Sequence, residues 1–203
     1  MNDLYATIIH DVKNQLAELA LRLGRREDTQ PEMELAMSAA RRLSEMLLAH
    51  REASNLLRAN ADTVNPADFL AILAAEYREL FPALSIEIDT GRAPSCAFFD
   101  DALVHMALAN ALHNACRHAL LHIQLAAYEQ NDMLILEVSD DGPGFPDSIL
   151  ATEGKSPSAV SGSGTGLGLY LACKIAELHQ LQDRHGSVEL SNAPGGCFRM
   201  LLP

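Results

Sequence analysis

The first sixty residues carry a hydrophobic pattern that is typical of two helices. Between residues 2 and 26 the apolar positions are separated alternately by four and three residues, which is the spacing of a heptad seam. These positions are Tyr5, Ile9, Val12, Leu16, Leu19 and Leu23. A polar break ends at Pro31, and a second helix is predicted from Pro31 to Asn60. Two helices joined by a short turn form an antiparallel hairpin, and its uncovered apolar surface predicts that two chains pair into a four-helix bundle.

From residue 66 onward the pattern changes to short alternating strands between helices. Helices are predicted over 66–80, with Asn65 as the cap, over 100–116 and over 167–180. Alternating apolar positions predict strands over 84–88, 96–99, 121–128, 133–139, 187–191 and 197–202, with a turn over 90–94. The predicted fold is therefore α+β, with a helical hairpin over 1–60 and a polar linker over 61–65. Residues 66–203 are predicted to form an α/β sandwich, in which helices cover one face of a mixed, mostly antiparallel sheet.

The helix predicted after Asp100 combines buried character with polar amides. Between Ala102 and Cys116 it has no Asp, Glu, Lys or Arg, which predicts burial on more than one side. It nevertheless carries Asn110 and Asn114, which are four residues apart and share one helix face. Buried amides need hydrogen-bond partners. Either neighbouring loops supply these partners, or the amides line a ligand pocket and offer oxygens to a hard cation such as magnesium.

Two glycine clusters follow in the second half of the chain. The strand through Leu134, Leu136 and Val138 ends at the segment Asp140–Gly144, where the carboxylate of Asp140 could accept a hydrogen bond from the amino group of a base. Glycines at 162, 164, 166 and 168 then lead directly into an apolar helix. Glycines before a helix allow backbone N–H groups to approach an anion, so the second cluster indicates a phosphate-binding loop. Two flexible turns are the alternative interpretation.

Composition and charge narrow the possible partners. The net charge of −12 argues against nucleic acid or an anionic membrane surface as a partner. No apolar run is long enough to span a bilayer, no signal peptide opens the chain, and the four cysteines form no CxxC pair. We therefore expect a cytoplasmic location, no membrane contact from this segment, and reduced cysteines in the core.

Four segments occur in an order that resembles the catalytic core of two-component sensor histidine kinases. The segment His10–Asn14 resembles their phosphoacceptor box, and the segment Asn110–Ala115 resembles their asparagine box. The segments Asp140–Gly144 and Gly164–Leu169 are similar to their two glycine boxes. Each motif is weak alone, but their order and spacing are specific and cover nearly the whole chain. By itself, His10 would be an ordinary surface histidine.

The resemblance implies a role for each matching residue. His10 would be the phosphorylated nucleophile, Asp11 its base, and Asn14 the residue that orients water for dephosphorylation of a response regulator. Asp140 would bind the adenine amino group, and Asn114, helped by Asn110, would hold Mg²⁺ on the phosphates of ATP. The remaining nucleotide-binding residues would be Arg117, His118, Gly142, Gly144, Gly164, Gly166 and Gly168.

The implied function is an ATP-dependent protein-histidine kinase that passes its phosphoryl group to a response-regulator aspartate and also acts as a phosphatase. The implied partners are a receiver domain and a second copy of the chain, which could be the cytosolic part of a longer receptor. Two features depart from the family: no clear phenylalanine box follows Phe145, and the ATP lid expected over 154–161 is short. One alternative is a nucleotide-binding or phosphotransfer scaffold of the same fold without kinase activity. Another is a serine kinase that inhibits a sigma factor.

Overall fold

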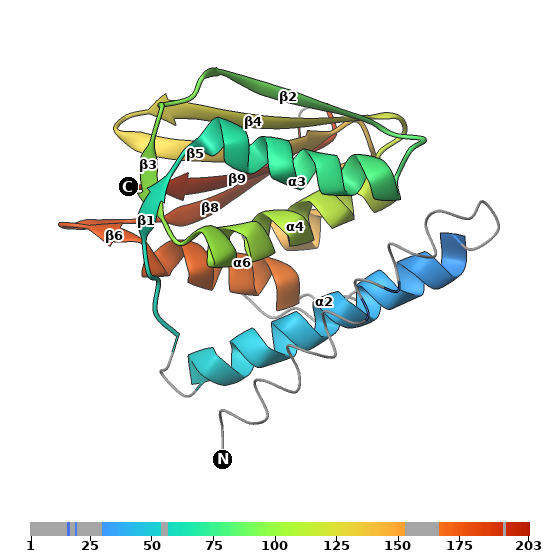
Figure 1. The fold of residues 1–203 in the computed structure, drawn as a ribbon, viewed down its shortest axis with the longest axis horizontal. Helices are drawn as coiled ribbons and strands as arrows, with labels where there is room; N and C mark the ends of the chain where they lie inside the picture. Colours follow the sequence, from blue (N-terminus) through green and yellow to red (C-terminus); the bar gives the residue numbers. More distant parts are fainter. Residues whose placement is uncertain (1–15, 17–18, 20–29, 54–56, 153–166, 193) are drawn as a thin grey trace. The chain divides into compact units, whose positions relative to one another are not determined.

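The chain divides into two compact units, Met1–Leu57 and Arg58–Pro203. The structure is a computed structural model that describes residues 16, 19, 30–53, 57–152, 167–192 and 194–203. In the first unit it describes helix α2, Gln30–Ala53, and helical conformation at Leu16 and Leu19 (Figure 1). The rest of the predicted helix over 2–26 lies outside the described residues, so the predicted helical hairpin stays a prediction.

The second predicted helix is shorter than the sequence indicates. Its prediction through Asn60 is wrong, because residues 57–60 are not helical. The backbone N–H of Asn60 donates instead to Oδ2 of Asp100, at 2.8 Å, in the second unit. Strand β1, Asp62–Val64, then pairs antiparallel with β3, Ala97–Phe99. Residues 60–64 are therefore already part of the second unit, before the predicted helix over 66–80 begins.

A five-stranded mixed sheet forms the centre of the second unit (Figure 1). Its strands are β2 (Ser85–Arg92), β4 (His122–Gln130), β5 (Met133–Asp140), β9 (Gly196–Leu202) and β8 (Ser187–Asn192), in that order. β2 is parallel to β4, whereas all other neighbours are antiparallel. The α+β class and the mixed, mostly antiparallel sheet are thus confirmed. The register places Asp140 opposite Ile123 and Ser139 opposite Cys197.

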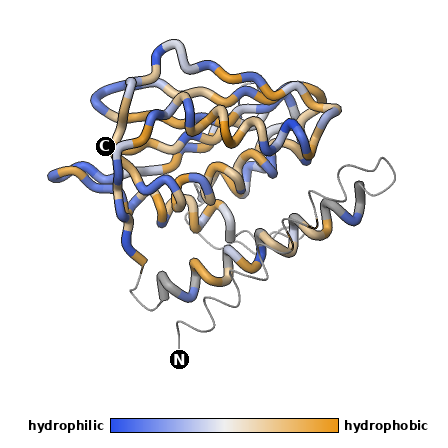
Figure 2. The backbone as a smooth tube through the Cα atoms, in the orientation of Figure 1, coloured by the Kyte–Doolittle hydropathy of each residue, from blue (hydrophilic) through white to orange (hydrophobic). Residues whose placement is uncertain are grey.

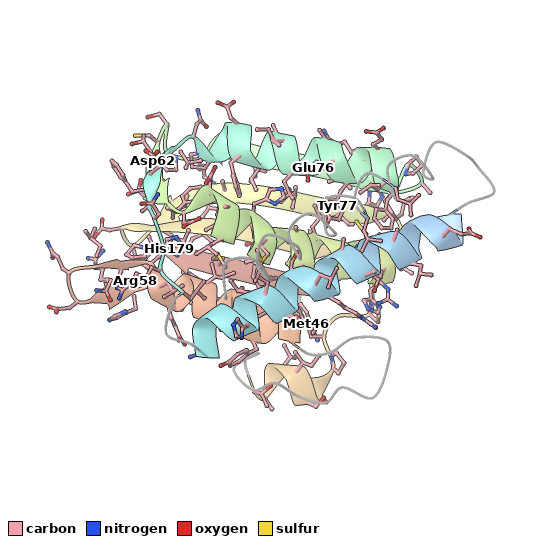
Figure 3. The ribbon with its side chains drawn as sticks, turned by 60° about the horizontal axis from the view of Figure 1, so that its bottom comes forward. Met46, Arg58, Asp62, Glu76, Tyr77 and His179 are labelled. Atoms are coloured by element: carbon pink, nitrogen blue, oxygen red, sulfur yellow. The ribbon has the colours of Figure 1, made fainter. Side chains whose placement is uncertain are left out.

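Three helices pack on one face of this sheet: α3 (Pro66–Leu80), α4 (Asp101–His118) and α6 (Leu167–Leu178) (Figure 1). Figure 2 shows apolar positions recurring along the strands and helices, with polar positions gathered in the turns. The absence of charge along the middle of α4 has the expected result, since Leu108 and Leu112 are fully buried. The hydroxyl of Tyr77, which extends from α3 toward α4 (Figure 3), donates to the carbonyl of Ala109 at 2.8 Å.

Local signals in the sequence account for most of the boundaries. Asn65 caps α3 by accepting from the N–H groups of Ala67, at 2.8 Å, and Asp68, at 3.3 Å, as predicted. Asn131 and Asp132 both have positive φ, 55° and 56°, which closes the β4–β5 hairpin in two residues.

Other elements differ from the sequence-based prediction. The turn expected over 90–94 begins later, because β2 continues to Arg92 with an irregular register after Asp89. β1, the short helix α5 (Asp147–Leu150) and the two-residue strands β6 (Gln180–Leu181) and β7 (Arg184–His185) carry no clear periodic signal. Among the cysteines, Cys116, Cys173 and Cys197 are buried, but Cys96 is exposed, so its assignment to the core is wrong. In the described part of the chain, no helix has the length and apolar character to cross a membrane.

Candidate functional site

The C-terminal half of α4 carries the two predicted amides. Asn110 is 7% exposed, and Asn114, one turn later on the same helix face, is half-buried. Neither side chain makes a hydrogen bond to any residue that the structure describes. An amide buried without a partner is costly, by about 1–3 kcal/mol. The first alternative from the sequence, hydrogen bonding to neighbouring loops, therefore finds no support in the described loops.

Arg117 and His118 form the last turn of the same helix, and both are exposed. They follow Asn114 by three and four residues, so they extend the face that carries the amides toward the end of α4. The guanidinium of Arg117 places a positive charge at the C-terminal end of α4, where the helix dipole favours cations. Arg117 and His118 also supply N–H groups on the helix face that carries the amides.

Asp140 is the last residue of β5 and offers one carboxylate oxygen to a ligand. Its Oδ1 accepts from the backbone N–H groups of Gly142, at 2.8 Å, and Gly196, at 3.4 Å. Its Oδ2 has no partner in the described residues. Two backbone donors on one oxygen fix the orientation of the carboxylate and leave the other oxygen as an acceptor. This arrangement suits recognition of an exocyclic amino group.

Glycines allow the end of α4 and the turn after β5 to lie in close contact. A Cβ on Gly142 would clash with the carbonyl oxygen of His118 and would lie 2.8 Å from Oδ1 of Asp140. A Cβ on Gly196 would lie 2.7 Å from Oδ2 of Asp140. Only glycine fits at these two positions without displacing a neighbour. The structure thus brings the asparagine-bearing helix and Asp140 to the same edge of the sheet.

Asp141 has a different role from its neighbour, and the sequence did not reveal it. Its carboxylate accepts from three consecutive backbone N–H groups, those of Leu120 at 2.8 Å, Leu121 at 3.1 Å and His122 at 3.0 Å. These hydrogen bonds, that of Leu121 first, lower the pKa of the Asp141 carboxyl below its ordinary value. Asp141 therefore holds the connection between α4 and β4, and Asp140 is the acid left for a ligand.

The remaining predicted residues are only partly described. Gly144 has a φ of +80°, which few residues other than glycine adopt easily. Gly168 lies in the first turn of α6, and this helix packs against α4. Gly164 and Gly166 lie outside the described residues, as do His10, Asp11 and Asn14. The roles assigned to all these residues stay predictions.

Comparison with known proteins identifies the family of the second unit. Residues 99–203 match the family described as "Histidine kinase-, DNA gyrase B-, and HSP90-like ATPase". The histidine-protein kinase AfsQ2 of Streptomyces coelicolor is 26% identical over 185 residues, which cover 86% of this chain and 33% of AfsQ2. The sensor-type histidine kinase PrrB of Mycobacterium tuberculosis is 27% identical over 179 residues, which cover 86% of this chain and 37% of PrrB. The chain thus spans about a third of the length of these relatives.

Solved structures share the fold. The histidine kinase AdeS of Acinetobacter baumannii superimposes with a TM-score of 0.65 at 18% identity, covering 87% of this chain and 84% of that structure. The ATP-binding domain of PrrB from Mycobacterium tuberculosis has a TM-score of 0.56 at 24% identity, covering 70% of this chain and 96% of that domain. The resemblance to the catalytic core of two-component sensor histidine kinases is confirmed, and the chain belongs to the histidine kinase-, DNA gyrase B- and HSP90-like ATPase family.

Proposed function

We propose that the chain is the catalytic core of a sensor histidine kinase, which phosphorylates His10 from ATP and passes the phosphoryl group to an aspartate of a response regulator. The observation that carries the proposal is a pair of acceptors without a hydrogen-bond partner among the described residues, the buried amide of Asn110 on α4 and Oδ2 of Asp140 at the end of β5. Polar groups that need no ligand are normally paired when they are buried. The sensor kinases among the relatives support the same activity.

The residues at this edge fit Mg²⁺-ATP. Asp140 would accept from the adenine amino group through Oδ2, because Oδ1 is already occupied by the N–H groups of Gly142 and Gly196. Asn114 and Asn110 would offer amide oxygens to Mg²⁺, which prefers oxygen ligands. Mg²⁺ would offset the negative charge of the phosphates during transfer. Arg117 and His118 would flank the nucleotide at the end of α4, and the glycines at 142, 144, 164, 166 and 168 would border it.

The phosphoryl transfer that follows is a substitution at phosphorus. A neutral ring nitrogen of His10 would attack the γ-phosphorus of ATP, and the bond from that phosphorus to the bridging oxygen would break and release ADP. Asp11 would take the proton from the other ring nitrogen, which becomes acidic once the ring is phosphorylated. General-base assistance of this kind contributes typically about 10²–10⁴ in rate.

Residues of the helix predicted over 2–26 would also take part in the later steps. The aspartate of a receiver domain would take the phosphoryl group from His10, and Asn14 would orient the water that later removes it. A homodimer would form through the first unit. In α2 of that unit, Leu35 and Met46 are 71% and 63% exposed, so large apolar side chains are available to a second copy.

Radiolabelled ATP tests the proposal on the full chain. The wild type should become labelled, and the label should survive alkali and be lost in acid, as phosphohistidine requires. His10→Gln should abolish labelling and retain nucleotide binding. The control is His50→Gln, an exposed histidine on α2, which should label normally. Nucleotide binding without label under any condition would favour the non-kinase scaffold instead, and acid-stable label would point to a serine kinase.

A further inference from the structure

Asn192, the last residue of β8, forms hydrogen bonds to a single distant residue through both the oxygen and the nitrogen of its side-chain amide. Its Oδ1 accepts from the backbone N–H of Phe145 at 2.7 Å, and its Nδ2 donates to the carbonyl of Phe145 at 2.9 Å. The two residues are 47 positions apart. The amide therefore pairs with the Phe145 backbone as a neighbouring strand would, and it fixes that segment in two directions.

The contact extends to the residue before Phe145. Gly144 has a φ of +80°, and a Cβ there would lie 2.6 Å from Cγ of Asn192. Glycine is thus required at 144 both for its backbone conformation and for its approach to Asn192. The loop from Gly142 to Phe145, which begins two residues after Asp140, is shaped around this one side chain.

Gly195 and Gly196, which follow Asn192 in the chain, lie close to Asp140. Asn192 pairs with Gly196 across the β8–β9 hairpin, and the N–H of Gly196 donates to Oδ1 of Asp140. A Cβ on Gly195 would clash with the carbonyl oxygen of Asp140. A Cβ on Gly196 would lie 3.4 Å from the ring of Phe145. Asp140 is therefore enclosed by two segments, the 142–145 loop and the 195–196 turn.

We propose that Asn192 is a positioning residue for recognition of the nucleotide base. It joins the two segments that border Asp140 and keeps Oδ2 of Asp140 accessible at a fixed orientation. The inference rests on the proposed function, because it takes Asp140 as the acceptor for the base. Asn192 itself is exposed, so its hydrogen bonds compete with water, and we expect its removal to weaken binding rather than to abolish it.

The test measures dissociation constants of ADP and of a non-hydrolysable ATP analogue, each with Mg²⁺, for the full chain. Asn192→Ala should weaken both by the same factor, about five- to tenfold, because both carry the same base. Asn192→Asp keeps the volume beside Gly144 and the acceptor for Phe145, but it places a carboxylate oxygen against the Phe145 carbonyl. It should weaken binding at least as much as Asn192→Ala. Both variants should also discriminate less between adenine and guanine nucleotides.

The matched control is Asn65→Ala. It also removes an exposed asparagine with two hydrogen bonds to backbone, those at the cap of α3, and leaves the candidate site intact. It should lower the melting temperature and leave both dissociation constants unchanged. Wild-type affinity in both Asn192 variants, or a loss for the ATP analogue alone, would overturn the inference while the proposed function stands. A wild-type chain that binds neither nucleotide would instead remove the proposed function, and this inference with it.

Discussion

The buried polar side chains at the two ends of α4 differ in whether they have hydrogen-bond partners. At the N-terminal end, the Asp100 carboxylate accepts from the N–H groups of Asn60, at 2.8 Å, and Leu103, at 2.9 Å. The N–H of Asp100 donates to Nε2 of His179 at 3.0 Å, so Nε2 carries no proton, and Nδ1–H donates to the carbonyl of Ile175 at 2.8 Å. In the C-terminal half, Asn110 is equally buried but finds no partner in the described residues.

This difference separates a structural cluster from a ligand site. The cluster of Asp100 and His179 is complete without a ligand, and in Figure 3 His179 lies toward the same end of the unit as Arg58 and Asp62. It joins the start of α4, the end of α6 and the chain at Asn60. Under the proposed function, the amide of Asn110, which has no hydrogen-bond partner among the described residues, would be used when the nucleotide binds. Burial without a hydrogen-bond partner, and not burial alone, is therefore the criterion on which the proposed site depends.

Asn110→Leu should have the largest effect. Leucine fills nearly the same volume without an unsatisfied amide, so the free energy of unfolding should stay equal or rise. The rate of autophosphorylation should fall about 100-fold or more, as is usual when one charge-stabilising group is lost. Chemical denaturation and labelling by ATP measure the two quantities. A large loss of stability with unchanged labelling would reverse the assignment of the two ends.

Asp100→Ala should show the complementary result. It removes the acceptor of the N–H groups of Asn60 and Leu103, of which that of Leu103 is buried, and should lower the free energy of unfolding by about 2 kcal/mol. Nucleotide affinity measured well below the melting temperature should match the wild type. Asp68→Ala, an exposed acid in the first turn of α3, is the control and should cost much less. Equal losses in the two variants would show that the buried cluster contributes nothing special.

Asp141→Asn should give a smaller effect that depends on pH. The pKa of Asp141 is lower in the folded protein than in the unfolded chain, so the charged carboxylate stabilises the fold above the unfolded pKa of about 3.9. That contribution should disappear as the pH falls through the lower, folded pKa. The stability difference between wild type and variant should therefore be full at pH 7 and narrow below about pH 4. Urea unfolding across this range measures it, and a constant difference would contradict the assignment.

Cysteine alkylation compares the exposed thiol of Cys96 with the three buried thiols. We expect it to give the smallest effect of these experiments. Burial raises the pKa of the Cys116 thiol to about 12, and burial also raises that of Cys197. Iodoacetamide at pH 8 should therefore modify Cys96 in the native protein and leave Cys116, Cys173 and Cys197 unmodified. Mass spectrometry after brief exposure gives the count, and a Cys96→Ser variant should take up no label. Early modification of Cys116 would show that the end of α4 opens readily.

Much of the second unit could be predicted from the sequence because its signals are local. The cap at Asn65, the uncharged α4 and the Asn131–Asp132 turn each depend on neighbouring residues. The different hydrogen bonding of the Asp140 and Asp141 carboxylates could not be predicted, because in the sequence they are simply two adjacent acids. It depends on which backbone N–H groups the fold brings near, and those of Leu120 and Gly196 come from remote segments. Asn192 was missed for the same reason, since its partner Phe145 is distant in sequence.

The attachment at Asn60 has a practical consequence for anyone who isolates the nucleotide-binding unit. A fragment that begins at the helix cap, Asn65, would lack β1 and leave one edge of β3 bare beside the exposed Phe98. It would also remove one donor from the Asp100 carboxylate. Starting the fragment at Arg58 retains both features.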